Sequence, residues 1–155
     1  YLHSRFGLPL TAAGAIVALY GAGGLAYTFL ARHLLRRFGE KGLARIGGAL
    51  MGTGFALLAF SSHWAWAIPA CLVAGLGFYM LHNTLQVNAT QMAPHARGTA
   101  VSLFACSLFL GQSLGIGAVA ILVDKYGIGA AFIASMIALP LIGAWFAHSI
   151  SSRLR

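Results

Sequence analysis

Residues 31–42, ARHLLRRFGEKG, decide the fold, because they concentrate charge between two long apolar segments. They hold four of the ten basic side chains and one of the two acids. Only 8% of the chain is charged and 59% is hydrophobic, whereas about 25% of an ordinary soluble domain is charged. A basic loop in this setting is typical of a cytoplasmic connection between two membrane-spanning helices.

Charge-free segments extend on both sides of this loop, and each is long enough to cross a bilayer, which takes about 20 apolar residues per helix. They cover residues 6–31, 46–96, 98–123 and 126–152. The second has room for two helices and turns at residues 61–64, SSHW. The apolar runs lack the alternation of a membrane β-barrel, and helices are the other structure that satisfies its backbone hydrogen bonds in lipid. The sequence therefore predicts an all-α membrane protein with five transmembrane helices, at residues 11–30, 43–60, 65–86, 99–123 and 129–146.

The basic side chains orient these helices. Only Arg5 and Lys125 fall on one side of the membrane, opposite the basic loop. The positive-inside rule therefore predicts an outer loop over residues 1–10 and a cytoplasmic tail over residues 147–155, in a chain embedded in the lipid bilayer. The net charge of +8 is confined to helix ends, so it does not indicate a nucleic-acid partner. On the cytoplasmic side the same alternation places Arg32, Arg36, Arg37, Lys41, Arg45, Arg97, Arg153 and Arg155.

The sequence does not indicate an enzyme. It contains no nucleophile-and-base pair, carboxylate dyad or cluster with metal-ligand spacing, so we assign no catalytic residue and no metal ligand. Cys71 and Cys106 lie inside predicted helices without a CxxC partner. No glycine-rich phosphate-binding loop is present, and no cofactor is expected.

The chain also echoes itself at a spacing of 88 residues. Residues 36–39, RRFG, align with residues 124–127, DKYG, so two helices end in a charged pair, an aromatic residue and a glycine. Repeats of a few helices are characteristic of transporter folds. If the helix at residues 65–86 opens the second repeat, its counterpart in the first repeat ends just before Tyr1. We therefore expect residues 1–155 to form a single bundle that lacks one N-terminal helix.

Three stretches carry a family resemblance: residues 1–8, YLHSRFGL, the glycines of residues 21–24 leading into RRFG, and residues 94–100, PHARGTA. With them the chain resembles the C-terminal half of a major facilitator superfamily transporter, closest to bacterial drug and sugar efflux permeases. The resemblance implies that the five helices are the eighth to twelfth, in a six-helix half-bundle, with Tyr1 at the end of the seventh. It also implies a bacterial inner-membrane protein, a small-molecule substrate and the N-terminal half of the same transporter as partner.

The basic loop matches this family's loop motif only in part. The family pattern has glycine, three residues, aspartate, arginine, any residue, glycine and two basic residues. Arg37 and Gly39 fit, whereas Arg36 stands in place of the aspartate and Glu40 in place of a basic residue. We therefore expect Arg36, Arg37 and Gly39 to shape a tight cytoplasmic turn instead of a charge relay.

Polar side chains concentrate on two of the predicted helices, and polar groups at membrane depth usually face a bundle interior or a water-filled cavity. Tyr79, Asn83 and Gln86 share one helical face, and Gln112 lies on the following helix. We select these four as candidates for the substrate pathway, which agrees with the cavity-lining positions that the resemblance implies. Hydrogen bonding between packed helices is the alternative explanation for them. Two glycine pairs, Gly48 with Gly52 and Gly111 with Gly115, have the spacing of close helix contacts.

His82 is the one ionisable side chain away from the predicted helix ends, and its unperturbed pKa of about 6.5 suits reversible protonation. It is our candidate for a proton relay. The sequence thus predicts part of a secondary active transporter that moves a small organic solute by alternating access, with efflux and proton coupling as the expected mode. The alternative is a non-transporting membrane scaffold or a truncated gene product.

Overall fold

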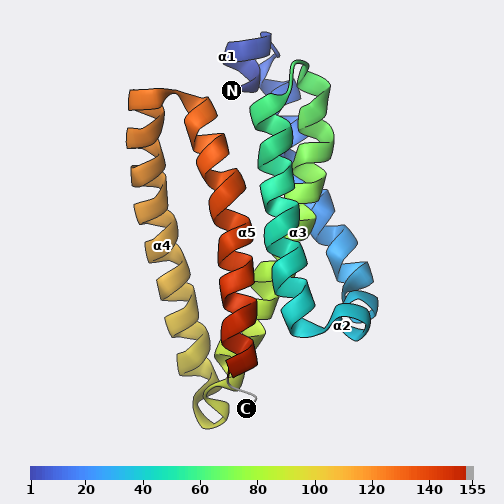
Figure 1. Ribbon diagram of the computed structural model, residues 1–155, viewed down its shortest axis with the longest axis vertical. Coiled ribbons are helices and arrows are strands. Elements are labelled where there is room, and N and C mark those ends of the chain that lie inside the picture. Colours follow the sequence, from blue (N-terminus) through green and yellow to red (C-terminus); the bar gives the residue numbers. More distant parts are fainter. Residues whose placement is uncertain (153–155) are drawn as a thin grey trace.

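The computed structural model describes residues 1–152, which form seven helical segments and no strand. Four helices are long and apolar enough to cross a membrane. They pack side by side with their axes roughly aligned (Figure 1). Along the chain the elements are α1 (Leu2–Phe6), α2 (Leu10–Phe60), η1 (Trp64–Trp66), α3 (Ala67–Gln91), η2 (Pro94–Ala96), α4 (Arg97–Tyr126) and α5 (Ile128–Ser152).

Helix α2 contains two of the five predicted spans. A straight helix of 51 residues would be about 76 Å long, more than twice the hydrocarbon thickness of a bilayer. The helical backbone breaks at Gly39, where φ is 63° and ψ is 178°, a conformation essentially restricted to glycine. The chain reverses there, so a first arm (residues 10–38) and a second arm (residues 40–60) run in opposite directions (Figure 1). The all-α membrane fold is confirmed, with both arms inside α2.

The predicted loop at residues 31–42 is wrong in one respect, because helix continues on both sides of Gly39. Basic side chains end the hydrophobic segment without ending the helix, since the backbone still gains its own hydrogen bonds there. For the same reason α5 continues to Ser152, so residues 147–152 of the predicted tail are helical. Residues 153–155, with Arg153 and Arg155, lie outside the described residues. The predicted outer loop contains the short helix α1.

Gly127 has the same unusual backbone as Gly39. Its φ is 79° and its ψ is 167°, and α5 begins at the next residue. These are the two glycines that the internal alignment pairs at a spacing of 88 residues. The two similar sequence segments therefore also share a backbone conformation, because each glycine connects one helix directly to the next.

Glycines bring both arms of α2 close to α3. A Cβ atom on Gly77 would lie 2.6 Å from the Gly47 carbonyl oxygen, and a Cβ on Gly47 would lie 2.7 Å from the Gly77 carbonyl oxygen. On the other arm, a Cβ on Gly75 would collide with the backbone of Tyr20. Lipid chains are as apolar as leucine, so membrane helices associate through such close packing of small residues.

Helix α5 packs on the second arm in the same way. A Cβ on Gly48 would lie 2.6 Å from the Leu139 carbonyl oxygen, and a Cβ on Gly52 would lie 2.5 Å from Pro140 Cγ. The packing role of this glycine pair is confirmed. Gly111 and Gly115 on α4 have no such neighbour within 4 Å, so their predicted close contact is absent from the described structure.

Helix α4 is the least embedded of the four long helices, with no buried residue along its length. Leu114 is 75% exposed, and Leu110 and Ile116 are comparably open. Figure 1 shows α4 standing beside α5 at the edge of the bundle, away from both arms of α2. This helix therefore offers a long apolar surface to lipid or to further protein.

The two ends of the bundle differ in charge. One end, called the basic end below, contains the α2 reversal and the α3–α4 connection, with Arg32, Arg36, Arg37, Lys41, Arg45 and Arg97 (Figure 1). The opposite end contains α1 and the α4–α5 turn, with Arg5 and Lys125. At that opposite end the Tyr1 hydroxyl donates a hydrogen bond to the Leu58 carbonyl oxygen at 3.0 Å, and the Tyr1 ring meets Phe132 edge to face. Tyr1 thus ties α1 to the second arm of α2 and to α5.

Candidate functional site

The candidate face of α3 lies against the first arm of α2. Tyr79 is half-buried with its ring over Gly24, where a Cβ would collide with that ring. One turn further along α3, Asn83 lies beside the side chain of Tyr27, which is buried on the first arm. Tyr79 and Asn83 therefore both lie in the seam between α3 and the first arm of α2.

Aromatic rings surround this seam. Tyr20 and Phe78 have ring centroids 5.7 Å apart, and the rings of Phe78 and Tyr79 meet edge to face at 5.5 Å. Phenol and amide groups thus stand beside apolar ring faces in the seam. Such a combination binds planar organic molecules through ring contacts while a few polar groups set their orientation.

Gln86 and Gln112 occupy different surroundings. Gln86 is half-buried on α3, one turn closer to the basic end than Asn83. Gln112 is exposed on α4, where it lines a separate shallow hollow of about 610 Å³ that ends at Asp124. The structure therefore brings Tyr79 and Asn83 into one seam and leaves Gln112 on another surface.

His82 connects α3 to α4. Its imidazole stacks on the Phe78 ring with centroids 5.2 Å apart and planes 10° apart, and it also contacts the Phe104 ring at 5.6 Å. The side chain is half-buried between these two phenyl rings. An imidazole in this position links the aromatic side of the seam to the helix that is least embedded in the bundle.

The loop motif forms the reversal of α2. Gly39 supplies the positive φ, the Arg37 guanidinium lies 5.8 Å from the Phe38 ring centroid, and Arg36 is exposed. The next residue, Glu40, accepts a hydrogen bond of 3.0 Å from Asn88 on α3. Asn88 also donates to the Thr84 carbonyl oxygen at 2.9 Å. Sequence reasoning missed this pair, because nothing in the local pattern relates residues separated by 48 positions.

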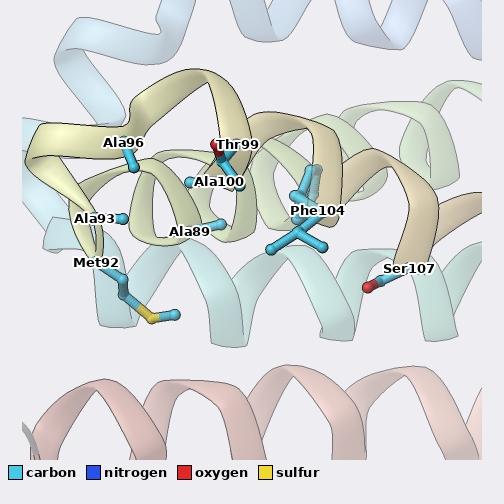
Figure 2. Close-up of a pocket in the computed structure, with 9 residues that line it drawn as sticks. Ala89, Met92, Ala93, Ala96, Thr99, Ala100, Phe104 and Ser107 are labelled. Carbon is cyan, nitrogen blue, oxygen red and sulfur yellow. The ribbon is translucent and has the colours of Figure 1, made fainter.

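A groove at the basic end was not predicted from the sequence. It begins where α3 passes through η2 into α4, and Figure 2 shows four alanines and Thr99 around that turn. It continues between α3, α4 and α5 past Trp145 and Phe146. Each of the two adjoining hollows measures about 420 Å³. Alanine is common in helices and does not indicate a groove, which arises only where three helices meet.

Comparison with known proteins places this helical bundle in a family. The model of the Major Facilitator Superfamily matches residues 1–153. Searches of curated proteins and of solved structures give no match. The family match agrees with the apolar helices and the glycine-packed bundle described above. The chain belongs to the Major Facilitator Superfamily and is a multi-pass membrane protein of the transporter type.

Proposed function

We propose that this chain is the C-terminal half of a transporter that exports small organic solutes by alternating access, driven by the proton gradient. The seam between α3 and the first arm of α2 provides its substrate contacts, through Tyr79 and Asn83 with Gln86 nearer to the basic end. The observation that carries this proposal is the cluster of phenols, rings and an amide at this seam inside an apolar bundle.

The surroundings of the seam indicate the class of substrate. Three tyrosines and Phe78 offer ring faces, while Asn83 and the phenol hydroxyls offer uncharged hydrogen-bonding groups. No acidic side chain lies on the described part of α3. A neutral or delocalised aromatic solute fits such a site better than a compact, strongly charged one, because burying a localised charge without a partner is costly.

Helix α4 supports the presence of a further domain. It has no buried residue, although it carries Gln112, Ser113 and Asp124 among its apolar side chains. Polar groups within a span rarely face lipid. The N-terminal half of the transporter is the proposed partner of this surface, and the basic end is the proposed cytoplasmic side.

The transport proposal is tested with the full-length protein in everted membrane vesicles, with ethidium as a fluorescent dye substrate. Asn83→Ala and Tyr79→Phe are expected to lower the initial export rate about tenfold at equal expression. Thr53→Ala is the matched control, because Thr53 is polar but lies exposed on the second arm, where it bonds only to Ala49 of its own helix. Unchanged export in both seam variants would remove the seam from the pathway.

Proton coupling is tested separately at His82. We expect a protonophore to abolish dye gradients made by the unmodified protein. His82→Gln retains a polar side chain but does not titrate, so it should bind dye normally and lose the response of export to an imposed pH gradient. Persistence of gradient-driven export in this variant would exclude His82 as the relay.

A further inference from the structure

We propose that the groove at the basic end binds an anionic phospholipid, with one acyl chain between α3, α4 and α5 and its phosphate facing Arg97. This inference concerns a surface apart from the Tyr79–Asn83 seam, and it does not depend on transport activity.

The groove has the size and lining of a hydrocarbon site. Its two hollows share Ala89, Met92 and Phe104, so they adjoin each other near the end of α3. Each hollow, at about 420 Å³, falls within the usual range of about 300–1,000 Å³ for organic ligands. Its lining is almost wholly apolar, with Thr99 and Asn88 among the few polar side chains. An extended alkyl chain fits this lining better than a hydrated solute.

The groove exists because the helices are joined through small residues. Ala89, Ala93, Ala96 and Ala100 surround the connection between α3 and α4 (Figure 2). Their side chains are too short to close the space that η2 leaves as the chain turns. Larger residues border the groove instead of filling it, with Phe104 on α4 and Trp145 on α5.

The second hollow is open at the surface of the bundle. Trp145 is 70% exposed and Met92 is 62% exposed, and both line the second hollow. A lipid therefore has a lateral route into the groove from the surrounding membrane. Tryptophan is also favoured at the boundary between hydrocarbon and headgroups, where the glycerol of a lipid lies.

Charge decides which lipid is preferred, because moving an alkyl chain from bilayer to groove exchanges one apolar environment for another. Arg97 is exposed and is the first residue of α4. This helix end has neither a side-chain cap nor an acidic residue in its first turn, so its positive dipole end faces the same region. Basic pockets between membrane helices attract anionic headgroups.

The acids of the chain do not compensate this charge. The sequence has two, Glu40 and Asp124. Glu40 is the one acid at the basic end and stands against six basic side chains there, while Asp124 belongs to the opposite end of the bundle. The basic end thus keeps a clear excess of positive charge from Arg32 to Arg97, which complements a phosphodiester.

The proposal is tested by native mass spectrometry of the full-length purified protein, with phosphatidylglycerol and phosphatidylcholine of identical acyl chains. Arg97→Gln should reduce phosphatidylglycerol adducts about fivefold and leave phosphatidylcholine adducts unchanged. Arg45→Gln is its matched control, because Arg45 is an exposed arginine on the second arm, whereas Arg97 directly follows Ala96, which lines the groove. An equal loss in both variants would indicate nonspecific attraction to the basic end and would overturn the site.

A second variant tests the acyl site in the groove. Ala100→Phe fills the first hollow and should reduce adducts of both lipids, while Ala49→Phe makes the same change at an exposed position on the second arm of α2, outside the groove. Retention of both lipids by Ala100→Phe would refute the groove as the acyl site. Inorganic phosphate at millimolar concentration should leave the adducts intact, and their displacement by phosphate would assign the site to a free anion.

Discussion

The contact between Gly47 and Gly77 yields the sharpest prediction about stability. Gly77→Ala places a methyl group 2.6 Å from the Gly47 carbonyl oxygen, 2.9 Å from Leu50 Cβ and 2.9 Å from the Met51 nitrogen. Two of these three atoms belong to backbone, so no side-chain rotation relieves the contact. Ordinary van der Waals separation begins at 3.4 Å, and the second arm of α2 must therefore move away from α3.

The expected cost follows from that displacement. Overpacking in a tight interface typically costs about 1–3 kcal/mol, because helices that separate lose part of the dispersion energy along their contact. Alanine recovers up to about 1 kcal/mol through its higher helix propensity. We expect Gly77→Ala to lower the free energy of unfolding by about 1–2 kcal/mol, and Gly77→Leu to lower it further, because its side chain is larger.

The measurement is unfolding of the protein in mixed detergent micelles with increasing dodecyl sulfate, followed by far-UV circular dichroism. Gly115→Ala is the matched control, since its methyl group meets nothing within 4 Å. This control should be neutral or slightly stabilising. If Gly77→Ala is as stable as Gly115→Ala, the close approach of the second arm and α3 does not hold, and the packing account of the bundle fails with it.

Three further predictions concern single contacts and use the same unfolding assay. Gly39→Ala forces a side chain into a backbone conformation that only glycine adopts readily, so it should lower the free energy of unfolding by about 1–3 kcal/mol. Gly98→Ala is its control and should leave stability unchanged, because Gly98 has an ordinary φ and open space around it. Asn88→Ala removes the hydrogen bond to Glu40 and should lower the free energy of unfolding by about 1 kcal/mol. Its control is Gln91→Ala, because Gln91 is exposed near the same end of α3. Equal stability of the two variants would contradict a stabilising contact between the α2 reversal and α3. Tyr1→Phe keeps the ring contact with Phe132 but loses the hydrogen bond to Leu58, so the free energy of unfolding should fall by about 1 kcal/mol. No loss in Tyr1→Phe together with a clear loss in Phe6→Leu would mean that apolar packing alone holds α1 in place.

The candidate site was predictable from sequence only in part. The spacing of Tyr79 and Asn83 places them on one face of a helix, and α3 is continuous through both positions. Their partners on α2, Gly24 and Tyr27, lie more than fifty residues earlier in the chain. The helical periodicity of a sequence predicts which side chains share a face, but it does not predict which helix packs against that face.

The same limit applies to the glycine pairs. Gly48 with Gly52 and Gly111 with Gly115 have identical spacing, yet the first pair contacts α5 and the second faces open space. The deciding quantity is the position of a second helix, because a small residue has a packing role only where another backbone approaches it.

The sequence alone determined that this is a helical membrane protein, where its apolar spans lie and which end collects the basic residues. These properties are additive along the chain, since the cost of placing a side chain in hydrocarbon depends mainly on that side chain. Tertiary structure decided the rest: the hydrogen bond from Asn88 to Glu40 and the groove between α3, α4 and α5. Each of these depends on the distance between segments far apart in sequence, and helix packing sets that distance.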